Sequence, residues 1–193
     1  MVNRKEAILD AAIQLFAEKG FTATPTSAIA KMAGVAEGLI FHYFKNKEGI
    51  FMHILDEMMG RYLEGIEANT KTASTGLEAI ESAISFHLRF SEARSREILI
   101  LIRDFPFDLM TRNSPARRMI ADHSDRVSAL LKKYIESGQR DGSIRDVSSR
   151  ETALILRAVL NGLSRLKMLG THLMPDLASE VVNFCRQGLA RKD

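Results

Sequence analysis

Apolar residues recur along almost the whole chain with the spacing of an α-helix. The clearest stripe has steps of four, three, four and four residues and consists of Phe51, Leu55, Met58, Tyr62 and Ile66. No segment alternates apolar and polar residues for long enough to favour a β-strand. The pattern therefore predicts an all-α fold.

Residues that start and stop helices divide the pattern into about nine elements. Gly20, Gly34 and Gly138 are expected to end helices, because glycine readily adopts the left-handed conformation found there. Ser114 followed by Pro115 predicts a helix start, with serine as the N-cap and proline in the first turn. The predicted helices span residues 3–19, 26–33, 36–43, 47–69, 77–91, 95–105, 115–137, 149–169 and 176–190.

The composition is typical of a soluble globular protein. The 193 residues are 46% hydrophobic and 26% charged, which allows one or two domains and excludes disordered and membrane-spanning classes. The chain starts with charged residues in place of the apolar stretch of a signal peptide. Its single cysteine, Cys185, excludes an intrachain disulfide and a cysteine-based metal site. We therefore expect a cytoplasmic protein with no membrane contact, no metal and no cofactor.

The spacing of small residues is a stronger indication of a DNA partner than the net charge of the chain. The net charge is only +3, and residues 1–50 carry six basic and five acidic side chains. Ala30 lies four residues before Gly34, and Ile40 follows six residues after that glycine. This spacing suits a helix-turn-helix, whose second helix fits the major groove of DNA. A generic helical hairpin is the alternative, because such spacings also arise by chance.

The segment 41–47 favours the DNA-binding interpretation. It places aromatic side chains beside Lys45 and Lys47 at the start of the next helix. Lysines reach phosphates, and backbone N–H groups at a helix N-terminus favour anions. Asn46 is expected to be the N-cap of that helix.

In these residues the chain resembles the TetR family of bacterial transcriptional regulators. The resemblance covers residues 7–51 and depends on three groups of residues that follow one another in the family's order. The first group is Ala11, Ala12, Leu15, Phe16, Gly20 and Phe21, and the second is Ile29, Ala30, Ala33, Gly34 and Val35. The third group is Gly38, Phe41, Tyr43, Phe44, Lys45, Asn46, Lys47 and Glu48. It implies a homodimer that binds a palindromic operator in double-stranded DNA and usually represses transcription until a small ligand releases it. The implied domains are a DNA-binding head at 1–46 and a ligand-binding and dimerisation body at 47–193.

The expected DNA contacts lie on the second helix of the motif, at the start of the first and at the start of the helix that follows. They are Thr26, Ser27, Glu37, Gly38, Leu39, Phe41, His42, Tyr43 and Lys47. The chain departs from the family at Ala36, Leu39 and Phe41, where the family often has hydroxyl side chains. Those hydroxyl contacts are therefore missing, and Leu39 suits contact with a thymine methyl group instead.

Two apolar stripes run along the predicted helix 149–169, although one would suffice for the core of a single chain. We expect the other stripe to pack with helix 176–190 against a second subunit, in a four-helix bundle. The expected interface residues, taken from both stripes and the last helix, are Ile155, Leu156, Val159, Leu160, Gly162, Leu163, Leu177, Val181 and Phe184. Either stripe could face the partner.

Apolar and aromatic residues of the body predict a pocket for a small hydrophobic or aromatic ligand with one polar group. Its expected lining is Met58, Tyr62, Phe86, His87, Phe90, Phe105, Met110, Met119 and His123. Solid core is the alternative, because methionine and phenylalanine at helical spacing are usually core. His87 and His123 are expected to be satisfied by backbone groups or water, since neither has a second metal ligand three or four residues away.

Two other functions stay open, a helical enzyme or ligand carrier without a DNA role and a protein-interaction module. No GxSxG, Walker, HExxH or dinucleotide-binding sequence occurs, so an enzyme would need a site built from scattered residues. The exposed residues of segment 34–47 would have no purpose in either alternative. We therefore expect a DNA-binding regulator with no catalytic residues.

Overall fold

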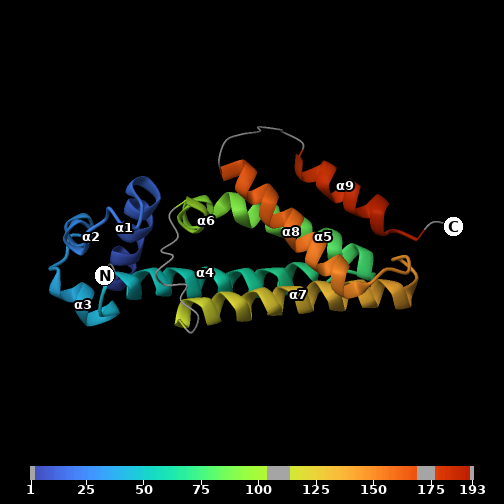
Figure 1. Cartoon of the computed structure of the whole chain (residues 1–193), viewed down its shortest axis with the longest axis horizontal. Coiled ribbons are helices and arrows are strands. Elements are labelled where there is room, and N and C mark those ends of the chain that lie inside the picture. Colours follow the sequence, from blue (N-terminus) through green and yellow to red (C-terminus); the bar gives the residue numbers. More distant parts are fainter. Residues whose placement is uncertain (1–2, 104–113, 169–176, 192–193) are drawn as a thin grey trace. The chain divides into compact units, whose positions relative to one another are not determined.

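The computed structural model describes residues 3–103, 114–168 and 177–191, and within them the chain forms nine α-helices (Figure 1). They are α1 (Arg4–Lys19), α2 (Thr26–Ala33), α3 (Gly38–Phe44), α4 (Lys47–Thr70), α5 (Gly76–Ala93), α6 (Ser95–Arg103), α7 (Pro115–Asp141), α8 (Ser149–Met168) and α9 (Leu177–Leu189). The described residues form no β-strand, only an isolated antiparallel bridge between Ile144 and Ala190. The all-α prediction is confirmed. The predicted helix ends at 105, 169 and 176 lie outside the described residues.

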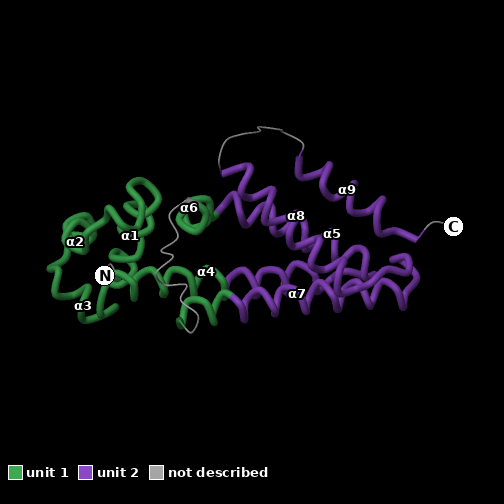
Figure 2. The backbone as a smooth tube through the Cα atoms, viewed as in Figure 1, with its two compact units in different colours: residues 1–60, 94–120 green, residues 61–93, 121–193 purple. Residues whose placement is uncertain are grey.

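The helices belong to two compact units, each with a hydrophobic core of its own (Figure 2). Unit 1 contains residues 1–60 and 94–120, and unit 2 contains residues 61–93 and 121–193. The division falls within α4 and within α7, so each of these helices contributes residues to both units.

Unit 1 holds the predicted helix-turn-helix. Gly34 ends α2 in the left-handed conformation, with φ of 66°, which lets the chain turn sharply into α3. Ala30 is buried, and Ile29 and Ile40 have no exposed surface. Asn46 accepts a hydrogen bond from the backbone nitrogen of Gly49 at 2.7 Å, so it caps α4 as predicted. The small residue, the turn glycine and the apolar residues thus take the places that their spacing indicated.

Unit 2 packs α5 against α8 and α9 (Figure 1). Its core also takes apolar side chains from α7 and from the second half of α4. Ile80 and Ile84 of α5 and Leu131 and Ile135 of α7 are at most 1% exposed. The helical stripes of these segments are therefore used to form a core within the single chain.

The prediction that Gly138 ends a helix is wrong, because α7 continues through it to Asp141. Gly138 is needed for space. A Cβ atom on it would lie 2.5 Å from Ile144, and a Cβ atom on Gly76 would lie 2.1 Å from the backbone nitrogen of Gly138. The carboxylate of Asp141 accepts a hydrogen bond from the backbone nitrogen of Gly76 at 2.8 Å. The start of α5 is therefore held directly against the last turns of α7.

Replacing Gly76 by alanine is expected to lower the free energy of unfolding by about 2 kcal/mol, because the added Cβ would meet backbone atoms of α7. Backbone atoms cannot move aside as the end of a side chain can. Gly60→Ala is the matched control, since nothing lies within 4 Å of a Cβ at that exposed position of α4. There the higher helix propensity of alanine predicts a gain of up to about 1 kcal/mol. Chemical denaturation measures both, and equal stabilities would contradict the packing argument.

Candidate functional site

The predicted recognition helix α3 has large side chains on its surface. Phe41 is 52% exposed and Tyr43 is 41% exposed, and Met32 of the neighbouring helix α2 is 45% exposed. His42 is also exposed, and its ring centroid lies 5.1 Å from that of Tyr43. Exposed aromatic groups on a short helix are unusual in a helix that serves only packing, so this surface is available to a partner.

Lys45 follows α3 and has φ of 68°, the only positive φ among the non-glycine residues that the structure describes. Glycine or asparagine adopts this conformation more easily, so the lysine is held in a strained backbone. Its side chain is exposed. Strain of this kind clusters at functional sites, which makes Lys45 a candidate that the predicted set of DNA contacts did not include.

Lys47 has a structural role that the sequence did not predict. Its ammonium group donates hydrogen bonds to the carbonyl oxygens of Phe21 at 2.8 Å and Thr22 at 3.3 Å. It also lies 4.5 Å from the centroid of the Phe21 ring. These contacts fasten α4 to the connection between α1 and α2. The ammonium has three N–H groups, so one remains for a phosphate.

Three other predicted DNA contacts are engaged within unit 1. The hydroxyl of Thr26 donates a hydrogen bond to Glu37 at 2.7 Å, which joins the start of α2 to the start of α3. Leu39 is half-buried and packs on the core of unit 1. Ser27 and Gly38, by contrast, are exposed.

Five of the predicted ligand contacts lie together in unit 2, around Tyr62 of α4. The ring of Tyr62 lies 5.3 to 5.6 Å from four other rings, which belong to Phe86, His87, Phe90 and His123. The remaining four either belong to unit 1 or lie outside the described residues. Met58 and Met119 pack against the core of unit 1, and Phe105 and Met110 lie outside the described residues.

His87 is buried and hydrogen-bonded on both ring nitrogens. Its Nε2 lies 3.2 Å from the carbonyl oxygen of Leu160 and 2.9 Å from the hydroxyl of Ser164. A carbonyl can only accept, so Nε2 carries the hydrogen, and Nδ1 accepts from the hydroxyl of Tyr62 at 2.8 Å. Burial lowers the pKa of His87 to about 4, although the Leu160 carbonyl acts in the opposite direction. The expectation that His87 is satisfied within the protein is confirmed for the backbone contact to Leu160.

His123 differs from His87 in its hydrogen bonding. Its Nδ1 atom is buried and has no hydrogen-bond partner among the described residues. Burial lowers the pKa of His123, and the positive charge of Arg126 lowers it further. The ring faces Tyr62 edge to face, so an unsatisfied polar atom stands at the side of the aromatic cluster.

The two stripes of α8 have different environments. Leu156 and Leu160 are buried in the core of unit 2, and so is Val181 of α9. These three side chains therefore contribute to the core of the single chain, and their place in an interface stays a prediction. Ile155 is 62% exposed and Phe184 is 74% exposed.

None of the remaining predicted interface residues is buried. Gly162 is exposed, whereas Val159, Leu163 and Leu177 are half-buried. The stripe through Ile155 is therefore the more exposed of the two.

The described residues offer neither a metal site nor a membrane-spanning helix. No three side chains of histidine, cysteine, aspartate or glutamate lie close enough together to hold a metal ion within residues 3–103, 114–168 and 177–191. In the same part of the chain, no helix combines the length and apolar character needed to cross a membrane.

Comparison with known proteins identifies relatives that cover most of this chain. Residues 8–54 match the family described as bacterial regulatory proteins, tetR family. The fatty acid metabolism regulator protein of Bacillus subtilis (strain 168) is 33% identical over 139 residues, which are 72% of this chain and 70% of that protein. These matches confirm the resemblance that the first helices indicated.

Solved structures agree with this result. The transcriptional regulator FadR from Bacillus subtilis, in complex with stearoyl-CoA, has a TM-score of 0.79 at 25% identity and covers 93% of this chain and 96% of its own. A bacterial regulatory protein in the tetR family from Rhodococcus RHA1 has a TM-score of 0.83 at 21% identity and covers 100% of both chains. The fold of the two units is therefore the fold of these regulators.

The stability of the protein is expected to fall as the pH is lowered from about 6.5 to about 4. His87 has a pKa of about 4 when folded, against 6.5 for a free imidazole, so the unfolded chain binds the proton first. Between pH 6.5 and pH 4 the free energy of unfolding falls by roughly 3 kcal/mol. Above pH 6.5 this contribution of His87 does not change with pH. Thermal denaturation between pH 4 and pH 8 measures it.

The variant His87→Gln should flatten this pH dependence, while the control variant of exposed His42, His42→Gln, should keep it. A remainder is expected from His123, whose pKa is lowered as well. A His87→Gln protein with an unchanged slope would contradict the assignment.

Proposed function

Because the chain belongs to the TetR family of bacterial regulatory proteins, we propose that it is a ligand-responsive repressor that binds a palindromic operator as a homodimer. The single observation that carries the proposal is the surface of α3, with aromatic side chains and Lys45 exposed at the end of a helix-turn-helix. The match over residues 8–54 covers this motif. On this proposal the protein is not an enzyme and acts in the cytoplasm.

The proposed division of labour places the DNA-binding head at 1–46 and the ligand-binding and dimerisation body at 47–193. Support for the head is the shared core of α1, α2 and α3, in which Ile8, Ile29 and Ile40 have no exposed surface. Support for the body is the separate core of unit 2. α4 begins directly after the head and carries Tyr62 into unit 2, so it is the proposed connection between ligand and DNA.

In the proposed complex α3 lies in the major groove. Gly38, Phe41 and His42 are then available to bases, and Tyr43 to a phosphate. Lys45 and the remaining N–H of Lys47 supply positive charge at the end of α3. Two heads of a dimer would read half-sites about one helical turn, roughly 34 Å, apart or a multiple of that.

The proposed dimer covers the exposed stripe of α8 together with Phe184 of α9. Ile155 and Leu166 are 62% and 42% exposed, and Gly162 between them leaves room for close approach. Large apolar side chains in a row on the surface usually mark an interface. The four-helix arrangement of two such pairs would remove them from water.

The proposed effector is a molecule with an acyl chain. This is a narrower class of ligand than the hydrophobic or aromatic molecule that the sequence predicted. Two relatives support it by name, one a regulator of fatty acid metabolism and the other bound to stearoyl-CoA. An effector that binds the DNA-incompetent arrangement about a hundredfold better shifts that equilibrium by roughly 2.7 kcal/mol per site. Two such sites in a dimer would together shift the equilibrium by roughly 5.4 kcal/mol, about what is needed to move it from 1:99 to 99:1.

Lys45→Gln is expected to weaken binding to all DNA sequences and to lower the salt slope by about one unit per subunit, because one phosphate contact per head is lost. The unfolding temperature should not fall, since the side chain is exposed and glutamine keeps the same backbone strain. Mobility-shift titrations against the DNA upstream of the protein's own gene, at several salt concentrations, measure this.

Two further variants make the test specific. Lys47→Ala should lower both the salt slope and the unfolding temperature, because it also removes the bonds to Phe21 and Thr22. Lys19→Gln at the exposed end of α1 should change neither. If the wild-type protein shifts no DNA from its own upstream region, the proposal that it binds an operator in that region is wrong. If it binds but Lys45→Gln leaves the slope unchanged, the assignment of Lys45 is wrong.

Phe184→Glu, alone or with Ile155→Glu, is expected to convert the dimer to a folded monomer, because it places charge in the proposed interface without touching the core of unit 2. Leu160→Glu should instead unfold unit 2, since Leu160 is 3% exposed. Sedimentation and circular dichroism separate the two results. A wild-type chain that sediments as a monomer at micromolar concentration, or a Phe184→Glu, Ile155→Glu protein that stays dimeric, would overturn the interface.

A further inference from the structure

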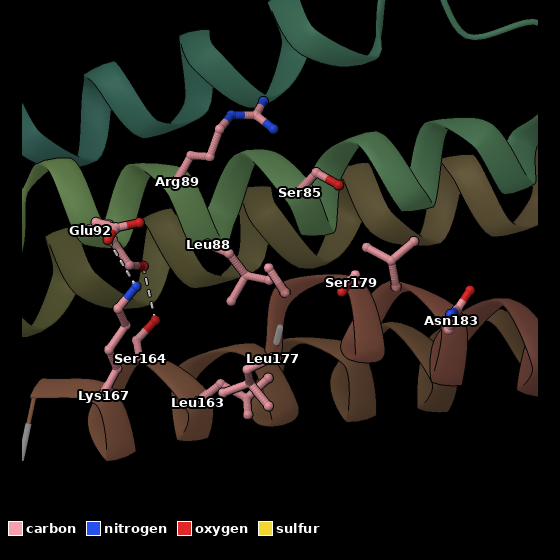
Figure 3. Close-up of a pocket in the computed structure, with 13 residues that line it drawn as sticks. Ser85, Leu88, Arg89, Glu92, Leu163, Ser164, Lys167, Leu177, Ser179 and Asn183 are labelled. Atoms are coloured by element: carbon pink, nitrogen blue, oxygen red, sulfur yellow. Dashed lines mark hydrogen bonds and ion pairs between the residues drawn. The ribbon is translucent and has the colours of Figure 1, made fainter. Parts of the chain in front are cut away.

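A pocket of about 540 Å³ lies in unit 2 between α5, α8 and α9 (Figure 3). Its apolar wall consists of Leu88 of α5, Leu163 of α8 and Leu177 and Val182 of α9. The aromatic cluster around Tyr62 does not contribute to this lining. A volume of this size is in the range that holds a small organic ligand.

The lining of the pocket also carries charge. Lys167 pairs with Glu92 at 3.3 Å, so these two charges balance each other. Arg89 is exposed and donates a hydrogen bond to the neutral side chain of Asn69 at 3.1 Å. The lining therefore has one net positive charge, which favours a ligand with an anionic group.

A second pocket, of about 460 Å³, shares Ser85, Arg89 and Val182 with the first. The two pockets therefore adjoin at these residues, two of which belong to α5. The lining of the second pocket is polar and also charged. Its Glu81 pairs with Arg186, and its Glu78 accepts a hydrogen bond from the backbone nitrogen of Ser74. An apolar chain in the first pocket could therefore continue into a polar group beyond Arg89.

The hydroxyl groups of Ser91 and Ser164 also line the first pocket, and they supply a donor. Their oxygens are 2.9 Å apart, so one hydroxyl hydrogen lies between them. His87 Nε2 already donates toward Ser164, because its hydrogen is fixed by the Leu160 carbonyl. The second hydroxyl hydrogen thus has no acceptor among the hydrogen bonds of the described residues. A carbonyl oxygen of a ligand would provide that acceptor.

We propose that the groove between α5, α8 and α9 binds the acyl part of an anionic acyl compound, with its carbonyl oxygen at Ser91 and Ser164 and its negative charge at Arg89. This site rests on the proposed function in its choice of an acyl ligand, and it locates that ligand away from the aromatic cluster. A fatty acid and an acyl thioester share this chemistry.

The same hydrogen bonds connect the groove to α4. A ligand bonded to the Ser91–Ser164 pair adds an acceptor to a chain that runs through His87 to the hydroxyl of Tyr62. On this proposal, occupation of the groove affects α4 through His87 and Tyr62, and Arg89 adds a second connection through its hydrogen bond to Asn69 of α4. Because α4 starts at the head, this is a route by which the ligand could change DNA binding.

The test is calorimetric titration of the full-length protein with decanoate, decanoyl-CoA and CoA alone. Arg89→Gln should weaken the acyl ligand about tenfold, Ser91→Ala roughly fivefold, and Ala178→Trp should abolish binding by filling the pocket. Arg150→Gln, at an exposed position of α8 outside the lining, should bind like the wild type. Circular dichroism checks that each variant is folded.

Tight binding of decanoate identifies a carboxylate as the anionic group, and binding of decanoyl-CoA without decanoate identifies the thioester. Either result supports the site if the lining variants weaken it. Absence of binding by both compounds, binding unaffected by Arg89→Gln and Ala178→Trp, or equal binding of CoA alone would overturn it. Operator binding is measured separately on the same proteins, so failure at the groove leaves the DNA-binding proposal standing, and the reverse also holds.

Discussion

The imidazole of His87 joins three helices of unit 2 in one hydrogen-bonded group. It lies on α5, accepts from Tyr62 of α4 and donates to the backbone and to Ser164 of α8. These bonds require the neutral ring with hydrogen on Nε2, and burial keeps the ring neutral by lowering its pKa. The aromatic cluster on one side and the groove on the other are both arranged around this residue. The polar centre of unit 2 therefore depends on one protonation state.

The two units are stabilised in different ways. Unit 1 depends on close crossings of short helices, for which Ala30 and Gly34 are small enough and flexible enough. Unit 2 combines long helices with buried polar groups, and Ser91, Ser164 and His87 are each at most 6% exposed. A buried polar network is costly unless each member is bonded, so it permits fewer arrangements than an apolar core does. The packing of unit 2 is therefore constrained mainly by hydrogen bonding. The packing of unit 1 is constrained mainly by the size of the residues where its helices cross.

The sequence allowed good prediction of elements that are determined locally. The cap at Asn46 and the turn at Gly34 depend on neighbouring residues, and both were identified correctly. Gly138 could not be, because its reason is the distant contact with Gly76 and Ile144. The two stripes of α8 were also equivalent until the fold showed which one α5 covers.

The candidate site was harder to predict than the fold. Lys47 has the residue type and position expected of a phosphate contact. Its ammonium group nevertheless donates hydrogen bonds to carbonyl oxygens of residues 25 and 26 positions away along the chain. The groove between α5, α8 and α9 has no motif, because its polar and charged residues are spread over three helices. Spacing identifies residues that share one helix face, and only the fold brings such scattered groups together.

The hydrogen bond from Thr26 to Glu37 joins the first residue of α2 to the residue before α3, so it closes the turn between the two helices. With Ile29 and Ile40 fully buried beneath it, the head is assembled before any partner arrives. No backbone segment between these residues then needs to fold on contact with DNA. The heat-capacity change of association should accordingly reflect the contact surface alone, without the large additional negative contribution that accompanies coupled folding and binding.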